Sequence, residues 1–144
     1  MKKIYILIPL VAFSAILLNC SSGPAAKDTV FQFIDAVKNS DSLQVVKLLD
    51  IDAYIRSKMP SMTPEDSAKV LKEYRITTIQ SLLGDGDVRY RFLHDQIVVN
   101  METRKDSVAE VEVSFIDRDI GNQLYTKMQL HLQPDHTWRI TFFK

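Results

Sequence analysis

Regular alternation of apolar and polar residues in the last third of the chain constrains its fold more than any other feature. Apolar side chains occupy every second position over residues 97–101, 109–115, 124–132 and 138–142, with Thr126 as the one exception. A period of two predicts β-strands that bury one face and expose the other to solvent. Four such strands joined by short loops predict an antiparallel meander with a single apolar face.

The lengths of the loops between these runs give an expected register. A turn at residues 104–106 would pair Val99 with Val111, with Ile97 and Met101 also facing inward. A connection over residues 119–122 would place Val113 opposite Met128. A turn at residues 134–136 would give the pairs Leu132 with Trp138, Leu130 with Ile140 and Met128 with Phe142.

Residues before Gly86 follow the helical period instead. Val30, Phe33, Ile34 and Val37 predict a helix over residues 28–39. A second helical pattern runs over residues 45–55 and ends at Met59-Pro60, and a third begins at Thr63-Pro64 and ends at Leu82. The aspartates expected to cap helices or mark turns are Asp41, Asp50, Asp85 and Asp135.

Three helices followed by a four-stranded meander predict an α+β domain over residues 28–144, with the helices packed on the apolar face. The order of elements and the segment Asp135-His136-Thr137-Trp138-Arg139-Ile140 resemble the nuclear transport factor two-like superfamily, also called the cystatin-like roll. The likeness is greatest to small bacterial lipoproteins of that superfamily. It implies a curved sheet and helices around a conical pocket that is used for small ligands, catalysis or dimerisation.

The first twenty residues predict export and lipidation. Lys2-Lys3 precede an apolar run too short for a permanent membrane span, which indicates a signal peptide over residues 1–19. The residues Leu17-Leu18-Asn19-Cys20 resemble the lipobox, and this implies that Cys20 becomes a lipidated N-terminus. The alternative is an ordinary signal peptide with a chance cysteine. Residues 20–27 would form a short tether, and Ser21 after the cysteine favours the outer membrane by resemblance to a bacterial sorting rule.

Composition and motifs argue against several classes of chemistry. Cys20 is the only cysteine, so no internal disulfide and no second thiol are expected. The numbers of acidic and basic residues are equal at 18, which does not favour a nucleic-acid partner. His94, His131 and His136 lack the spacing of a metal site, and we expect neither a metal nor a cofactor.

Asp95 is the only acidic residue that the alternation could direct into the pocket. Val88, Tyr90 and Phe92 alternate in the even phase, whereas the next run follows the odd phase, so we expect a bulge or bend after Phe92. If the odd phase extends to Asp95, its carboxylate faces Phe115 and could act as a general base. If the bend follows Asp95, the group is solvated beside His94, and we favour this reading because burial of an unpaired carboxylate is costly. The candidate pocket residues are Tyr74, Asp95, Phe115, Met128 and Trp138.

The favoured function is a membrane-anchored envelope module, without enzymatic activity, that binds a protein partner or a small apolar ligand. Two alternatives remain open. One is an acid–base enzyme of the isomerase or dehydratase type that works in the pocket. The other is a structural subunit of an envelope assembly that pairs, as a homodimer or with another protein, through the outer face of the sheet.

Overall fold

The computed structural model describes residues 25–59 and 64–143, so the leader, Cys20 and the expected cap at Thr63 lie outside the described residues. Within these ranges five helices precede four strands. Their bounds are α1 (Ala26–Lys38), α2 (Ser42–Leu48), α3 (Ile51–Lys58), α4 (Pro64–Leu83), α5 (Asp87–His94), β1 (Gln96–Lys105), β2 (Val108–Ile116), β3 (Gln123–Leu132) and β4 (Trp138–Phe142).

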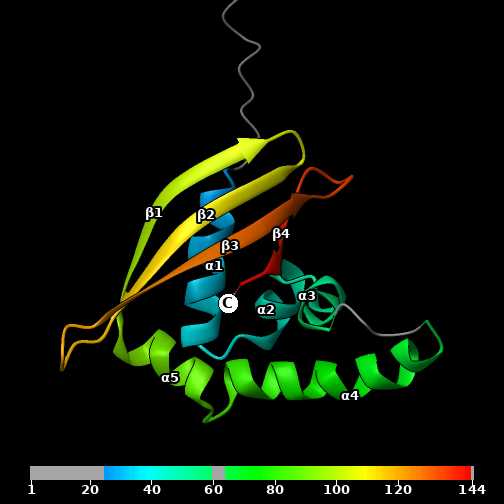
Figure 1. Cartoon of the computed structure of the whole chain (residues 1–144), viewed down its shortest axis with the longest axis horizontal. Helices are drawn as coiled ribbons and strands as arrows, with labels where there is room; N and C mark the ends of the chain where they lie inside the picture. Colours follow the sequence, from blue (N-terminus) through cyan, green and yellow to red (C-terminus); the bar gives the residue numbers. More distant parts are fainter. Residues whose placement is uncertain (1–24, 60–63, 144) are drawn as a thin grey trace, which may run out of the picture.

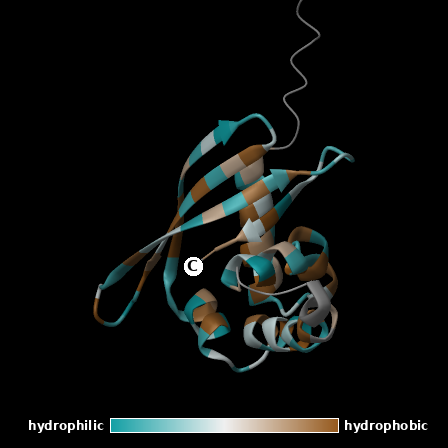
Figure 2. Ribbon diagram, turned by 45° about the vertical axis from the view of Figure 1, so that its right-hand side comes forward, coloured by the Kyte–Doolittle hydropathy of each residue, from teal (hydrophilic) through white to brown (hydrophobic). Residues whose placement is uncertain are grey.

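The α+β class and the antiparallel meander are confirmed. The strands lie in the order β1-β2-β3-β4, and each pairs antiparallel with the next. The sheet curves over α1, while α4 and α5 run along the end of the molecule opposite the β1–β2 hairpin (Figure 1). Apolar residues recur along α1 and the strands (Figure 2), and the buried residues of these elements form one core cluster.

The second expected helix is divided into α2 and α3 by two residues that contact the sheet. Leu49 is extended, is almost completely buried and forms a parallel bridge with Ile140. The N–H of Asp50 donates to the carbonyl of Ile140 at 2.8 Å, and the Asp50 carboxylate accepts from the N–H of Ala53 at 3.0 Å to cap α3. Pairing with β4 thus interrupts a helical pattern that the sequence alone would continue.

The alternating segment at residues 88–92 is helical, not extended. Gly86 precedes α5 in an extended conformation, and Asp87 occupies the first turn, where an acidic side chain favours the helix dipole. Phe92 is buried, whereas Val88 and Tyr90 are exposed, as expected of a surface helix with a narrow apolar stripe. The break after Phe92 is therefore the junction between α5 and β1, with Asp95 as the C-cap of the helix.

The expected β1–β2 register is wrong because the hairpin turn is shorter and β1 contains a bulge. Lys105 pairs with Val108 across a two-residue turn, in which Asp106 has a φ of 53°. Val99 consequently pairs with Val113 instead of Val111. The register shifts again between Val99 and Glu102, which leaves Met101 61% exposed rather than inward.

The expected β2–β3 register is also wrong, by two residues. Val113 pairs with Thr126 instead of Met128, so the apolar residues keep their face although their partners change. Strand β2 stops earlier because the Asp117 carboxylate accepts from the N–H of Asp119 at 2.8 Å. The backbone N–H of Asp117 also donates to the carbonyl of Asn122 at 2.9 Å, which closes a longer loop.

The last hairpin is confirmed near its turn and wrong beyond a bulge. Leu132 pairs with Trp138 and Leu130 with Ile140, but Phe142 pairs with Gln129 instead of Met128. Thr141 is the additional residue, and its hydroxyl donates to the carbonyl of Gln129 at 3.2 Å. The bulge brings Phe143 into the core and leaves Phe142 half-buried.

Candidate functional site

Asp95 lies in a polar depression between the end of α5 and the β2–β3 loop. It is half-buried, and the same depression is lined by Asp117, Arg118 and Asp119 of the β2–β3 loop. His94 stacks on Tyr90 in this region, with ring centroids 3.9 Å apart. The carboxylate is thus surrounded by charged loop residues and does not line the hollow next to Phe115.

The other residues named from the sequence do not converge on one site. Tyr74 is 42% exposed on α4, whereas Met128 and Trp138 are part of the buried core of the sheet. The Arg104 guanidinium lies 4.9 Å from the centre of the Trp138 ring and covers its outer side. Phe115 is the one that lines a hollow, so the candidate site has to be built around it.

A cavity of about 320 Å³ lies between α3, α5 and the inner face of the sheet. Aromatic rings form much of its wall: Phe92 packs edge-on against Phe115 with centroids 5.2 Å apart, and Tyr54 stacks on Phe143 at 4.6 Å. The complete lining is Tyr54, Lys58, Asp87, Val88, Arg91, Phe92, Phe115, Leu124, Thr126 and Phe143. We call this hollow the aromatic pocket.

Charge at the aromatic pocket is concentrated at its rim. Lys58 of α3 donates from Nζ to the carbonyl of Phe143 at 2.9 Å, and its ammonium lies 5.2 Å from the centre of the Tyr54 ring. Burial raises the pKa of the Tyr54 hydroxyl above its ordinary value, so this group stays protonated at neutral pH. Arg91 and Asp87 add one charge of each sign from α5.

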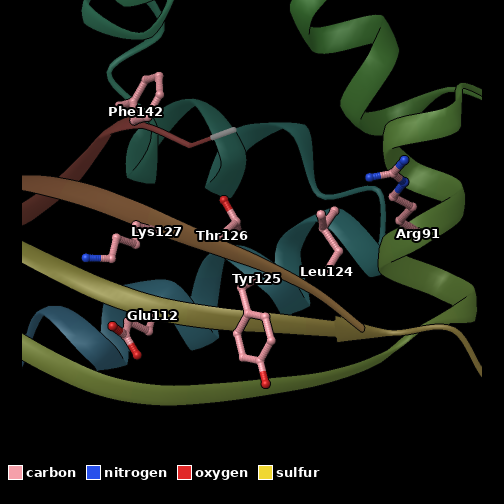
Figure 3. Close-up of a pocket in the computed structure, with 7 residues that line it drawn as sticks. All are labelled: Arg91, Glu112, Leu124, Tyr125, Thr126, Lys127 and Phe142. Atoms are coloured by element: carbon pink, nitrogen blue, oxygen red, sulfur yellow. The ribbon is translucent and has the colours of Figure 1, made fainter. Parts of the chain in front are cut away.

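A second hollow of about 810 Å³ continues from the aromatic pocket along β3. The two share Arg91, Leu124 and Thr126, so they form one connected surface depression. Figure 3 shows Leu124 and Thr126 on one side of β3 and Tyr125 on the other, with Arg91 reaching toward Leu124 from α5. Phe142 and the outward side chains of Glu112 and Lys127 complete the lining. We call this second hollow the edge groove.

Comparison with solved structures identifies the fold. No protein-family model matches the sequence, and no curated protein is similar enough to be recognised as a relative. The fold is similar to that of a Campylobacter jejuni protein proposed to be an NTF2-like transpeptidase, with a TM-score of 0.51 over 84% of this chain and 100% of that one. The chain has an NTF2-like fold. At 14% identity the likeness concerns the fold alone and carries no activity with it.

The wall of the aromatic pocket comes from α3, α5, β2, β3 and the residue after β4, and this explains why sequence patterns found so little of it. Tyr54 and Phe92 each belong to a short helix, and Phe143 enters the pocket only because of the β4 bulge. The signal in the sequence that could have pointed to these residues is their aromatic side chains. Of the lining residues, the alternation singled out Phe115 alone as facing a pocket.

The described part of the NTF2-like domain gives no metal cluster and no spanning helix. No three His, Cys, Asp or Glu residues within it lie close enough together to hold a metal ion. None of its helices is both long and apolar enough to cross a bilayer. The chemistry that the aromatic pocket itself offers is apolar contact, one protonated phenol and positive charge at the rim.

Proposed function

We propose that this protein is a lipid-anchored envelope module that binds an apolar group in the aromatic pocket. The observation that supports this proposal is the pairing of aromatic walls with a charged rim around a cavity of about 320 Å³. Ligand sites in proteins are commonly hollows of about this size, lined by apolar side chains with a few polar groups. Burial of one phenyl-sized group there would contribute roughly 2–3 kcal/mol.

The composition of the aromatic pocket favours binding over acid–base catalysis. Its carboxylate, Asp87, is exposed at the start of α5, and Asp95 lies in a different depression. An acid–base enzyme needs a proton acceptor within hydrogen-bonding distance of the reacting group. The isomerase or dehydratase alternative therefore has no residue in this pocket to support it, apart from an exposed carboxylate.

The membrane part of the proposal rests on the lipobox-like residues and on the attachment of the first helix. The structure begins α1 at Ala26, so a tether of residues 21–25 would reach at most about 18 Å when fully extended, and the domain would work near a membrane surface. At the start of α1, Lys27 donates from its backbone N–H to Glu102 at 2.8 Å and from Nζ to the Asn100 carbonyl at 2.7 Å. These bonds fix the start of α1 to the bulge of β1.

A direct test uses the dye 1-anilinonaphthalene-8-sulfonate. Its aromatic rings would pack against the aromatic walls, and its sulfonate would pair with the Arg91 guanidinium. We expect enhanced fluorescence on binding to the folded protein, with perturbed NMR signals from the Phe92 and Phe115 rings. Val88→Trp, which fills the rim of the aromatic pocket, should weaken binding at least tenfold. Leu93→Trp is the matched control because Leu93 is on the same helix but outside this pocket.

Two results would overturn the proposal. One is the absence of saturable binding to the folded protein. The other is equal weakening by Val88→Trp and Leu93→Trp, which would locate the dye elsewhere. Near-ultraviolet circular dichroism of each variant establishes that the dye is not reporting a loosened core.

A further inference from the structure

Strand β4 covers only part of the edge of β3. The pairs between the two strands begin at Gln129 and end at Leu132, while β3 itself starts at Gln123. After the bulge at Thr141 the chain turns inward, and Phe143 packs on Tyr54 instead of following β3. Among the described residues, no strand pairs with β3 on this side between Gln123 and Met128.

The backbone groups that point out of this edge can be assigned from two hydrogen bonds. The N–H of Leu132 donates toward β2, to the carbonyl of Ser107 at 2.8 Å. The carbonyl of Gln129 points the other way and accepts from Thr141. Because successive residues of a strand alternate in direction, Tyr125 and Lys127 direct both N–H and C=O groups out of the open edge.

The edge groove lies along these same residues. Leu124 through Lys127, four consecutive positions of β3, line it, together with Phe142 at one end and Arg91 across from the strand (Figure 3). Within the part of the chain that the structure describes, the Arg91 guanidinium has no hydrogen bond or ion pair. The inward residues Leu124 and Thr126 are shared with the aromatic pocket, so the open edge and the pocket are adjacent.

We propose that the edge groove binds an extended peptide segment of a partner protein, which adds a strand to β3. The segment would place one large apolar side chain in the aromatic pocket and an acidic side chain beside Arg91. This inference rests on the proposed function, because the aromatic pocket supplies the contact for that apolar side chain.

Backbone geometry favours a peptide over a small molecule. Residues two apart in a strand are separated by about 6.6–6.8 Å, and each presents one donor and one acceptor. An extended peptide reproduces this spacing along its whole length and directs every second side chain to the inner face. The guanidinium of Arg91, which makes no hydrogen bond or ion pair with any described residue, adds a preference for a carboxylate at that face.

Amide hydrogen exchange measured by NMR on the folded protein tests the proposal. In the free protein the amides of Tyr125 and Lys127 should exchange rapidly, while those of Thr126 and Met128, which face β2, should be protected. The probe is a capped seven-residue peptide that alternates threonine and valine around one phenylalanine, with one glutamate. Its addition should protect the Tyr125 and Lys127 amides at least tenfold.

A control peptide keeps every side chain but carries N-methyl groups on the amides that would face β3. It should bind about tenfold more weakly, because lost backbone hydrogen bonds outweigh the retained side-chain contacts. On the protein, Lys127→Pro removes an N–H that lies outside the β2–β3 ladder, and it should weaken the peptide without weakening the naphthalene sulfonate. Lys127→Ala separates this effect from loss of the side chain, which forms an ion pair with Glu110 at 2.7 Å.

The possible results separate the two proposals. Binding of both peptides with equal affinity, with shifts confined to Phe92 and Phe115, would overturn strand addition and leave the aromatic pocket as a small-ligand site. Protection of the Tyr125 and Lys127 amides in the free protein, with a dimer in sedimentation, would overturn it in favour of a second copy at the edge. Failure of both the peptide and the naphthalene sulfonate to bind would overturn both proposals.

Discussion

Tyr54 of α3 and Phe143, which follows β4, stack with ring centroids 4.6 Å apart and an interplanar angle of 27°. The contact exists because the bulge at Thr141 reverses the phase of β4 and directs Phe143 instead of Phe142 inward. Lys58 joins the two rings by donating to the Phe143 carbonyl while lying over Tyr54. One inserted residue thus connects the last strand to the third helix and forms one wall of the aromatic pocket.

The bulge buries Phe143 and leaves the adjacent Phe142 half-buried, so the two rings should contribute differently to stability. Phe143→Ala should lower the free energy of unfolding by about 3–5 kcal/mol, because it removes a buried ring that also contacts Phe33. Phe142→Ala should cost about 1 kcal/mol, since its ring is half-buried and its main contact is the Lys58 ammonium at 5.0 Å. Urea unfolding of both variants measures the difference. A larger loss of unfolding free energy for Phe142→Ala would contradict the bulge and support the register in which Phe142 faces the core.

Engineered cysteines can test the register of β2 and β3. Glu112 and Lys127 are direct partners, and because the N–H and C=O of Lys127 point away from β2 they form a non-hydrogen-bonded pair, whose Cα atoms lie about 4.5 Å apart. Glu112→Cys with Lys127→Cys should therefore crosslink readily on mild oxidation, in a Cys20→Ser background that leaves no other thiol. Glu112→Cys with Gln129→Cys corresponds to the register expected from the sequence and should crosslink poorly. The opposite order of efficiency would show that β3 is shifted by two residues.

The ion pair between α3 and α4 should give stability a defined pH dependence. Arg75 donates from Nε to the Asp52 carboxylate at 2.7 Å, and this hydrogen bond together with the charge of Arg75 lowers the pKa of Asp52 below 3.8. A carboxyl with a lowered folded-state pKa adds stability at pH values above its unfolded pKa, and this contribution disappears as the pH falls through the lowered value.

Asp52→Asn should therefore cost about 0.2–1 kcal/mol at pH 7, a small amount because both side chains are partly exposed. The cost should vanish as the pH falls through the lowered pKa of Asp52, and it should shrink in high salt. Asp85→Asn, at an exposed turn residue, is the matched control and should change the free energy of unfolding little at pH 7. An Asp52→Asn effect that persists unchanged at low pH would mean that the carboxylate contributes by some route other than its charge.

Lipidation of Cys20 is a prediction that concerns residues outside the described ranges. Intact-mass analysis of the membrane fraction should show a mature chain that begins at Cys20 and carries acyl chains, because two or more chains are needed for stable anchoring. Cys20→Ser should move the protein to the soluble fraction. A mature N-terminus at another residue, or a soluble wild-type protein, would contradict the prediction.

The sequence by itself determined the inward face of β2 and the caps of two helices. Alternation from Ala109 to Phe115 gave the buried face of β2, and Asp41 and Asp50 cap α2 and α3 through the N–H groups of Gln44 and Ala53. Face and cap are local properties, fixed by a period of two or by a hydrogen bond across one turn. The face on which a residue lies is still predicted correctly when the register is wrong by two residues, because such an error leaves every side chain on the same face.

Tertiary structure alone decided the register of the strands, the bulges in β1 and β4, and the helical state of α5. It also decided the division of the second expected helix at Leu49. Each depends on partners distant in the sequence, such as Ile140 for Asp50 or Phe115 for Phe92. The aromatic pocket and the edge groove could not be predicted for the same reason. They form where elements from residue 54 to residue 143 meet, and the bulge at Thr141 directs the end of β4 away from the edge of β3.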